Sequence, residues 1–554
     1  MTHPLFTRHQ ALLEDALNAA RTRSFYSAFS ELPKSYGGAA AEEGRAAFDA
    51  RLHAAFELQQ AATVGAAGHE RSPYGFDLDI TYPKADVDGL FAAITRTALP
   101  AWRQAGREAW VGVALEILHR LNRRSFEIAY AVMHTTGQAF MMAFQAGGPH
   151  AQDRGLEAVA YAWDELRRIP VEAIWEKPQG KNEPLKLHKR YTIVPRGIGL
   201  VIGCCTFPTW NAYPGLFASL ATGNAVMVKP HPAAILPLAI TVAVAREVLA
   251  EAGFSPELVT LLAHDAAEER LPRALALRPE VRLIDFTGSS ANGTWLEQHA
   301  RQARVYTEKA GVNPIIIDST SDLEAMARNI AFSLSLYSGQ MCTAPQNIYV
   351  PKEGIDTLGG RVPFDGVADA IGAAIRKLVA DPARAVEVLG AVQNEGIAAR
   401  IAIARNMGEV VVDSTSLTHP QFPDARIRTP LLLKFRGADE ETLMQEWFGP
   451  IAFVVATEDT AHSIEIASKA VAERGAITLS AYTTRDTVMD DVRTSAEAVG
   501  VAVSFNLLGG IFVNQSAAFS DFHATGANPA ANACFTDAAF VADRFRVVQS
   551  RRHL

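Results

Sequence analysis

The spacing of apolar positions changes at about residue 195. Before it, apolar residues recur at helical intervals, as in the stretch 115–150, which is rich in Ala, Leu and Met. We therefore expect residues 1 to about 165 to be mostly helical. After it, short apolar runs alternate with helical stretches, which predicts parallel βαβ units arranged in two α/β lobes rather than one.

The apolar runs give specific element positions. A helix is expected at 238–252, where Gly253 follows as a good terminating residue. The stretch 197–228 holds no Asp, Glu, Lys or Arg and is long enough to span a bilayer, but its prolines favour a strand, a loop, a helix and a second strand. Strands are expected at 198–204, 225–229, 258–262, 281–286, 304–308, 315–318 and 347–350.

Two further segments predict exposed strands. Residues 175–192 intersperse Lys and Arg with Leu and Tyr, which is typical of an arm that reaches another subunit or of an edge hairpin with solvated lysines. Residues 540–548 partly alternate apolar and polar side chains and predict a strand.

Composition narrows the function classes. An apolar fraction of 49% and a charged fraction of 20% over 554 residues are those of an ordinary globular protein. The net charge of −8 argues against a general nucleic-acid or membrane-surface binder. Four cysteines, without zinc-site spacing, indicate neither a disulfide framework nor a metal site and favour a reducing cytoplasm. The first residues show no targeting segment.

The strongest chemical candidate is Cys342, which follows a Gly-Gln turn and comes after Glu308 in the chain. A thiolate attacks carbonyl carbon, and a carboxylate can then activate water on the resulting thioester. A lone cysteine would by default be a packing residue. Lys229 and the run Phe286-Thr287-Gly288-Ser289 end predicted strands, where α/β sheets bind ligands and helix starts hold phosphate; a tight turn would need the same glycine.

Six short motifs resemble, in order, those of the aldehyde dehydrogenase superfamily, from about residue 85 to residue 526. Each motif alone is weak, but their order and the preserved Glu-to-Cys spacing are specific. They are Thr206-Phe207-Pro208, Gly223-Asn224 with Lys229-Pro230, Phe286-Thr287-Gly288-Ser289, Glu308-Lys309-Ala310-Gly311, Gly339-Gln340-Met341-Cys342 and Glu446-Trp447-Phe448-Gly449-Pro450.

The resemblance implies an α/β fold with a Rossmann-type cofactor domain, an α/β catalytic domain and a β-strand oligomerisation arm, in a homodimer or homotetramer. The expected segments are 1–165 (helical part and start of the cofactor domain), 166–194 (oligomerisation hairpin), 195–307 (cofactor domain), 308–510 (catalytic domain) and 511–554 (C-terminal oligomerisation segment). In the family, a strand like 540–548 pairs with a neighbouring subunit; an edge strand within one subunit is the alternative.

The resemblance also implies the chemistry. Cys342 would attack a small aldehyde, hydride would pass to NAD or NADP, and Glu308 would activate water for hydrolysis. Thr206 stands where the family has an oxyanion-stabilising Asn, so either Thr206 or the nearby Asn211 donates there, or activity is poor. The implied cofactor contacts are Ile202, Lys229 and His231, Gly288 and Ser289 for the pyrophosphate, and Glu446 with Phe448 for the nicotinamide ribose.

Departures from the pattern bear on cofactor and substrate. Pro232 replaces a Glu that binds ribose hydroxyls in NAD-preferring members, so a 2′-phosphate would not be repelled and NADP is favoured over NAD. Ala310 replaces a glycine, and 263–265 replaces a Gly-rich loop. These departures and the N-terminal extension resemble the phenylacetic acid degradation (PaaN) branch, which implies a CoA-linked semialdehyde as substrate. No hydratase domain follows Gly526, so ring-opening hydrolysis is not expected.

Three other interpretations remain open. A CoA-acylating dehydrogenase generally lacks the carboxylate that Glu308 provides, and a catalytically impaired binding protein would not need the set Cys342, Glu308 and Glu446. A cysteine hydrolase would need a histidine beside Cys342 in space. His523 stands where the family has a loop near the substrate mouth; it is interpreted as a surface residue, with contact to the substrate as the alternative. Cys204 and Cys205 are interpreted as small buried residues.

Overall fold

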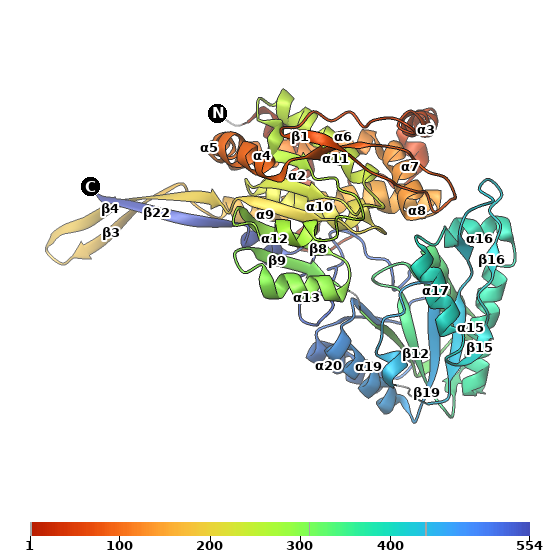
Figure 1. The fold of residues 1–554 in the computed structure, drawn as a ribbon. Coiled ribbons are helices and arrows are strands. Elements are labelled where there is room, and N and C mark those ends of the chain that lie inside the picture. Colours follow the sequence, from red (N-terminus) through yellow and green to blue (C-terminus); the bar gives the residue numbers. More distant parts are fainter. Residues whose placement is uncertain (1–2, 310, 438–439) are drawn as a thin grey trace.

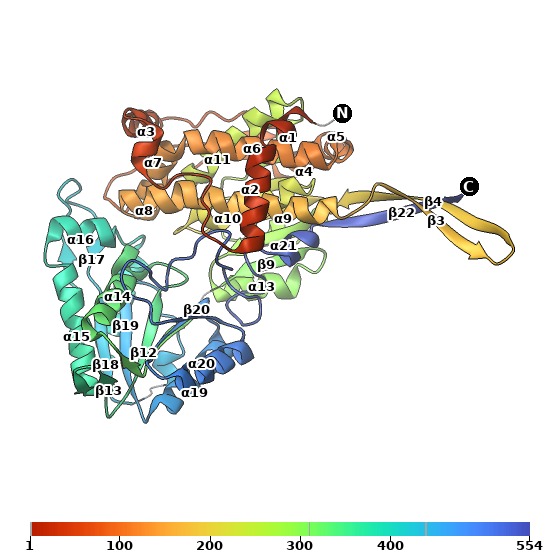
Figure 2. The same cartoon turned by 180° about the vertical axis from the view of Figure 1, so that it is seen from behind.

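A computed structural model describes residues 3–309, 311–437 and 440–554. Two α/β lobes lie side by side, and a long thin arm projects from one of them (Figures 1 and 2). Each lobe is built on its own, mostly parallel sheet, so the predicted α/β class with two lobes is confirmed.

The first lobe contains a five-stranded parallel sheet in the order β7-β6-β5-β8-β9. The five expected strands are confirmed, with ends that differ by at most two residues, because each is a short run rich in aliphatic, aromatic or β-branched residues between turns. They are β5 (Ile198–Ile202), β6 (Ala225–Lys229), β7 (Val259–Leu261), β8 (Val281–Thr287) and β9 (Arg304–Glu308), and the helices between them are α10 (Pro208–Ala221), α11 (Leu236–Glu251), α12 (Leu271–Ala276) and α13 (Ser290–His299).

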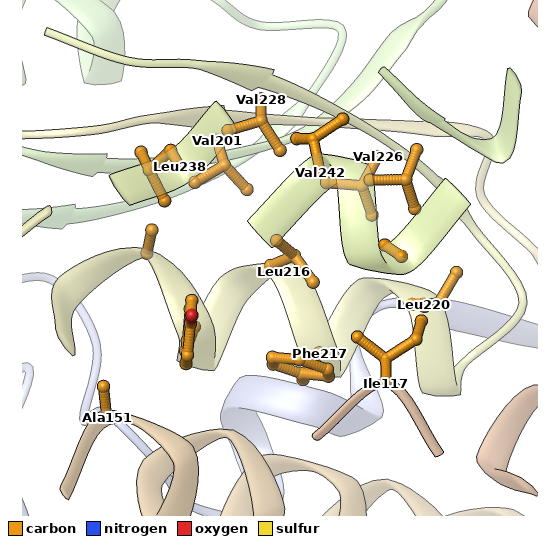
Figure 3. Close-up of a cluster of buried hydrophobic side chains, with 14 of the residues drawn as sticks. Ile117, Ala151, Val201, Leu216, Phe217, Leu220, Val226, Val228, Leu238 and Val242 are labelled. Atoms are coloured by element: carbon orange, nitrogen blue, oxygen red, sulfur yellow. The ribbon is translucent and has the colours of Figure 1, made fainter. Parts of the chain in front are cut away.

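The helix α10 is the centre of this lobe's core (Figure 3). Its Leu216 lies towards Val201 and Val228 of the sheet, and its Phe217 lies on the opposite side of the helix (Figure 3). Gly155 of α9 (Ala151–Arg167) lets the two helices approach closely, since a Cβ there would lie 2.7 Å from the Phe217 ring. The residues 197–228 therefore form β5, α10 and β6 as expected, and no helix in the described part of the chain is long and apolar enough to cross a bilayer.

The N-terminal part is mostly helical, as predicted. The two-stranded sheet of β1 (Thr63–Ala67) and β2 (Tyr82–Ala85) was not predicted, because β1 is almost fully exposed and shows no apolar alternation. The helices are α1 (Pro4–Arg8), α2 (Gln10–Thr22), α3 (Ala40–Asp49), α4 (Val87–Ala93), α5 (Leu99–Ala105), α6 (Arg107–Arg123), α7 (Ser125–Thr136), α8 (Phe140–Gln145) and α9.

The second lobe holds a seven-stranded sheet in the order β15-β18-β19-β12-β10-β20-β21, parallel except for β15. The expected strands at 315–318 and 347–350 correspond to β10 and β12. The strands are β10 (Asn313–Ile317), β12 (Pro345–Pro351), β15 (Glu409–Val412), β18 (Leu431–Phe435), β19 (Ile451–Thr457), β20 (Thr478–Tyr482) and β21 (Ala502–Phe505).

Helices and two small sheets surround this second sheet. The helices are α14 (Leu323–Ser335), α15 (Phe364–Leu378), α16 (Pro382–Leu389), α17 (Glu395–Ala404), α18 (Glu440–Leu443), α19 (Thr460–Arg474) and α20 (Asp486–Val499). The small sheets pair β11 (Ser319–Thr320), β13 (Ile355–Thr357) and β14 (Gly360–Val362), and β16 (Ser416–Leu417) with β17 (Ile427–Arg428).

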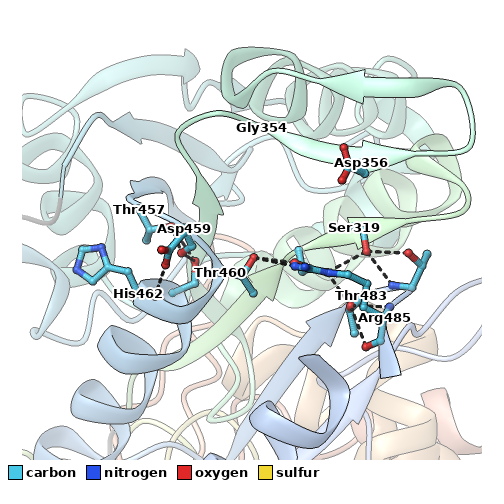
Figure 4. Close-up of polar contacts among 12 residues, drawn as sticks. Ser319, Gly354, Asp356, Thr457, Asp459, Thr460, His462, Thr483 and Arg485 are labelled. Carbon is cyan, nitrogen blue, oxygen red and sulfur yellow. Dashed lines mark hydrogen bonds and ion pairs between the residues drawn. The ribbon is translucent and has the colours of Figure 1, made fainter. Parts of the chain in front are cut away.

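A polar network holds the carboxyl edge of the second sheet together (Figure 4). Asp318, next after β10, accepts hydrogen bonds from the Thr460 and Thr483 hydroxyls at 2.6 and 2.7 Å and forms an ion pair with Arg485. Burial alone would raise the pKa of Asp318, but these donors lower it. The network ties β10 to β20 and to the start of α19, at the end of the sheet away from Cys342.

The arm is a three-stranded antiparallel sheet in the order β22-β4-β3 (Figures 1 and 2). It consists of β3 (Glu172–Gln179), β4 (Asn182–Pro195) and β22 (Phe545–His553). The expected strand at 540–548 was wrong in its first half, because Asp537 accepts a hydrogen bond from the Phe540 N–H at 2.7 Å and starts the helix α21 (Ala538–Ala542). Within the chain, β22 pairs with β4.

Arg544 fastens the C-terminal segment to the first lobe. Its fully buried guanidinium donates to both carboxylate oxygens of Asp285 on β8, at 2.6 and 2.9 Å, and to the Ser219 hydroxyl at 2.8 Å. It also lies 4.1 Å above the Phe540 ring. This ion pair sets where β22 leaves the lobe to join the arm.

We expect Arg544→Met to lower the free energy of unfolding by about 3–5 kcal/mol, because it leaves the buried Asp285 carboxylate without its counter-charge. Chemical denaturation followed by circular dichroism measures the change. Arg546→Met, two residues on and exposed, is the matched control. Equal stability of the two variants would contradict the fastening role.

Candidate active site

The carboxyl end of the first sheet meets the amino end of the second, and the two predicted reactive groups lie there. Glu308 is the last residue of β9, and Cys342 comes just before β12. The thiol sulfur and a carboxylate oxygen lie within 4.8 Å of each other. The fold therefore brings together the pair that the sequence analysis singled out.

An unusual turn presents Cys342. Tyr337, Ser338 and Gly339 all have left-handed backbone conformations, with φ of 51°, 49° and 62°. The surrounding protein holds this turn: the Tyr337 hydroxyl donates to the Thr136 carbonyl at 2.6 Å, and the Ser338 hydroxyl to the Leu389 carbonyl at 3.1 Å. Such strain persists only where neighbouring structure imposes it, and it clusters at functional sites.

Two amide side chains fix the backbone on either side of the turn. The Gln340 side-chain oxygen accepts from the Gln393 N–H at 2.8 Å. The Asn313 amide donates to the carbonyls of Cys342 and Ala344 at 2.8 and 2.9 Å. The motif glutamine therefore has a structural role in this chain, and the peptide of Cys342 is held on the carbonyl side.

Glu308 is buried, and the side chains of Asn211 and His523 contact its carboxylate. The Asn211 amide donates to one carboxylate oxygen at 3.1 Å, and Nε2 of His523 lies 3.1 Å from the other. Burial alone would raise the pKa of Glu308, but the charge and hydrogen bond of His523, with hydrogen bonds from Cys342 and Asn211, bring it below its ordinary value. The carboxylate is therefore ionised near neutral pH and able to act as a base.

The surroundings have the opposite effect on the Cys342 thiol and disfavour its charged form. Its removal from bulk water raises its pKa well above the ordinary value, and the neighbouring Glu308 charge raises it further. A thiolate is the nucleophilic form, so the thiol must lose its proton to react.

His523 was expected at the surface, and that prediction was wrong. It is only 3% exposed, and its Nε2 lies 3.8 Å from the Cys342 sulfur. The backbone of His523 bonds to that of Phe535, so the segment around 515–535 folds back across the site. The only signal in the sequence for a place at this site was that His523 stands where the family has a loop near the substrate mouth.

Thr206 does not point at Cys342. Its hydroxyl contacts the Cys204 sulfur at 4.0 Å, and its carbonyl accepts from the Gln138 amide at 2.8 Å. Asn211, by contrast, lines the same cavity as Cys342. The geometry therefore presents Asn211, rather than Thr206, to a group bound at the thiol.

Cys342 opens into a cavity of about 670 Å³. Its walls combine aromatic and sulfur-containing side chains with residues of the N-terminal extension. Lys and Arg are missing from its described lining, and its acidic members are Glu31, Asp153, Glu387 and Asp521. Its aromatic and sulfur-containing lining residues include Tyr26, Met141, Phe207, Trp210, Phe332 and Phe512.

A second cavity, of about 700 Å³, lies at the end of β6 and carries positive charge. Lys229 is 4% exposed, and burial lowers its pKa to about 8. Burial and the Lys229 charge lower the pKa of His231 to about 4, and Arg270 and Arg273 also line this space. Burial lowers the pKa of Lys229, and a buried positive charge in the wall of a cavity fits a site for an anionic ligand.

The other predicted cofactor contacts stand outside the described lining of both cavities. Ser289 caps α13, whose Asn292 lines the second cavity, and the Gly288 N–H donates to the Glu308 carbonyl at 3.0 Å. Ile202 ends β5. In the second lobe, Glu446 and Phe448 are partly exposed; burial raises the pKa of Glu446 to about 7, although Arg400 opposes this. Ala310 lies outside the described residues.

Comparisons with known proteins agree with this arrangement. A sequence model of the aldehyde dehydrogenase family matches residues 80–504. The chain is 26% identical over 386 residues to 1-pyrroline-5-carboxylate dehydrogenase of Geobacillus thermodenitrificans (strain NG80-2), covering 67% of this chain and 69% of that protein. It is 25% identical over 390 residues to aldehyde dehydrogenase LUC3 of Fusarium sp, covering 69% and 75%.

Solved structures extend the likeness. The crystal structure of an NAD-dependent aldehyde dehydrogenase from Burkholderia multivorans is 65% identical to this chain, with a TM-score of 0.99 over 100% of both chains. A Thermus 1-pyrroline-5-carboxylate dehydrogenase with bound NAD is 19% identical, with a TM-score of 0.72 over 96% of this chain and 99% of that one, which shows a shared fold.

We expect Gly339→Ala to reduce turnover by about ten- to a hundredfold, because a Cβ would lie 2.4 Å from the Gly449 carbonyl oxygen and the residue is left-handed. The displaced turn would move the thiol. Steady-state kinetics and thiol alkylation measure the effect. Gly359→Ala, where the nearest atom is 3.7 Å away, should be silent; an unaffected Gly339→Ala enzyme would show that the turn does not position Cys342.

Proposed function

Because the chain belongs to the aldehyde dehydrogenase family, we propose that it oxidises an aldehyde to the carboxylic acid with NADP or NAD through a thioester on Cys342. The observation that carries this is the pairing of Cys342 with the ionised Glu308 at the carboxyl edge of the first sheet, facing a cavity. A nucleophile and a base in reach of one reacting atom are the minimum for this chemistry.

The steps follow from the two groups. The Cys342 thiolate attacks the aldehyde carbon, a carbon–sulfur bond forms, and the carbonyl oxygen becomes an oxyanion. The nicotinamide supplies a hydride acceptor when it is bound. Glu308 then takes a proton from water, the hydroxide attacks the thioester carbon, and the carbon–sulfur bond breaks to release the acid.

The oxyanion needs a donor in the cavity. Asn211 has two amide hydrogens, of which Glu308 accepts one. We therefore infer that Asn211 supplies the oxyanion donor that the family places at the position of Thr206. Thr206 itself remains the alternative if its side chain turns towards Cys342.

The second cavity supports the cofactor assignment. Lys229 and Arg273 offer positive charge, and Pro232 stands where a carboxylate would repel a 2′-phosphate, although Asp265 and Glu269 also line the space. Asn292 lines the same space and lies in the first turn of α13. The start of a helix is where backbone N–H groups can bind a phosphate. NADP is therefore favoured over NAD.

The substrate proposal is a CoA-linked semialdehyde of phenylacetate degradation, as the branch resemblance implies. The apolar walls near Cys342 suit the carbon chain that carries the aldehyde. Acidic lining residues such as Glu31 and Asp521 are unfavourable for the phosphates of CoA, so we propose that these stay outside this cavity. A plain apolar or aromatic aldehyde is the simpler occupant.

The arm, the compartment and the assembly remain proposals. The largely exposed β3, with Ile174 55% and Trp175 38% exposed, suits an oligomerisation surface in a homodimer or homotetramer. All four cysteines are free, in keeping with the expected reducing cytoplasm.

One alternative gains from the structure. A cysteine hydrolase needs a Cys–His pair, and Cys342 with His523 forms one. It would cleave thioesters or esters without a nicotinamide cofactor. CoA acylation gains nothing, because the buried Glu308 is placed to direct water at the thioester.

We expect Cys342→Ala to abolish aldehyde-dependent reduction of NADP. Glu308→Gln should slow turnover by about 10²–10⁴-fold and accumulate the acyl-enzyme, since hydrolysis loses its base. Absorbance of the reduced cofactor and intact-protein mass measure both. Cys534→Ala, a buried cysteine outside the cavity lining, is the control. Release of acid from a thioester or ester without any nicotinamide cofactor would favour the hydrolase instead.

We expect NADP affinity to fall as pH rises through about 8, because Lys229, whose pKa burial lowers to about 8, is positive below that value and neutral above it. Loss of such a charge-assisted contact weakens binding by roughly ten- to a hundredfold. Pro232→Glu should shift preference towards NAD. Calorimetric titration of both cofactors at neutral and alkaline pH tests this, with Lys352→Met as an exposed control. Tighter binding at alkaline pH would refute it.

A further inference from the structure

We propose that His523 is a third catalytic residue, which takes the proton of the Cys342 thiol and holds it as an imidazolium against Glu308. This deepens the proposed function, on which it rests for the later steps, and it makes the site a Cys–His–Glu relay rather than a Cys–Glu pair. A histidine of this kind was assigned no role from the sequence.

One ring nitrogen faces both partners. Nε2 of His523 lies 3.8 Å from the Cys342 sulfur and 3.1 Å from a carboxylate oxygen of Glu308. A proton that moves from sulfur to Nε2 therefore lands beside a carboxylate, which stabilises the new positive charge. The buried site strengthens this attraction because the surroundings screen it weakly.

The contact of the second ring nitrogen, Nδ1, decides which nitrogen of His523 can accept the thiol proton. Nδ1 lies 3.5 Å from the Ser516 hydroxyl oxygen, which also accepts from the buried Arg154 guanidinium at 2.9 Å. With Arg154 as a donor, that oxygen is best matched by an Nδ1–H, which leaves the Nε2 lone pair for the thiol proton. Ser516 is thus a positioning residue for the tautomer.

Packing keeps the ring in place. Trp210 lies edge-on to it, with ring centres 4.6 Å apart, and the Phe535 N–H donates to the His523 carbonyl at 2.8 Å. The Arg154 guanidinium lies over the Trp210 ring, 5.2 Å from the ring centre. The imidazole therefore has one orientation prepared for proton transfer, which is how catalytic groups gain efficiency.

The thiol needs this partner. Its surroundings and the Glu308 charge oppose a lone thiolate. With His523, the S–H bond breaks as the N–H bond forms, so the site exchanges a neutral pair for a thiolate–imidazolium pair. The sulfur electron pair then attacks the aldehyde carbon. After hydrolysis releases the thiolate, the proton returns from Nε2, while the proton from water leaves through Glu308.

Several titratable groups surround His523 and bear on its pH behaviour. Glu308 and Cys342 contact it directly, and Cys204 influences Cys342. The other charged groups that face it or its neighbours are Arg154, Asp153 and Asp521. Of these, Cys342 is the group whose pH profile the proposal predicts.

The test is the rate of iodoacetamide alkylation of Cys342 in the cofactor-free protein, followed by peptide mass across the pH range. Wild type should alkylate readily near neutral pH with a shallow profile. His523→Gln, which keeps size and loses the base, should react at least about tenfold more slowly near neutral pH and recover in alkali. His299→Gln, at the exposed end of α13, should match wild type. Superimposable profiles of His523→Gln and wild type would overturn the proposal.

A second measurement needs no histidine variant. The difference in ultraviolet thiolate absorbance between wild type and Cys342→Ala should be present near neutral pH and lost on acidification; absorbance that appears only in strong alkali would overturn the proposal. Neither readout requires aldehyde oxidation. If alkylation depends on His523 but no aldehyde is oxidised, the proposed function fails and the relay stands; if turnover is normal and alkylation is independent of His523, only the relay fails.

Discussion

The structure depends on keeping a carboxylate ionised in a place where water is largely excluded. Desolvation of Glu308 disfavours its charge, and the protein offsets this with the Asn211 amide and the His523 ring, each 3.1 Å away. The same carboxylate makes a thiolate at Cys342 harder to form. Every other element of the site can be understood as a response to these two opposed demands.

The two lobes share the work of positioning. The first lobe supplies Glu308 at a strand end and Asn211 from α10, both on rigid elements with fully buried neighbours. The second supplies Cys342 on a strained turn that Asn313 and the first lobe's Thr136 hold from either side. Strain in such a turn is tolerated because many contacts impose it at once. The reactive pair is therefore a property of the interface between lobes and of neither lobe alone.

Local patterns predicted much of the fold and little of the geometry. A strand such as β6 is a short apolar run between turns, so it was predicted closely. The exposed β1 has no such period, and α21 replaced an expected strand because a capping aspartate outweighed weak alternation. His523 reaches the site from 181 positions away along the chain, and no spacing rule reports contacts of that range.

The shared carboxylate also orders the chemistry. While His523 carries the thiol proton, Glu308 serves as its counter-charge and stays ionised. Once an acyl group occupies the sulfur, no thiolate remains to accept that proton, and the imidazolium keeps the carboxylate in its basic form. The carboxylate is therefore ionised when the thioester has formed, and it can then accept a proton from water. A single carboxylate can in this way serve acylation and hydrolysis in turn, without a separate base for each step.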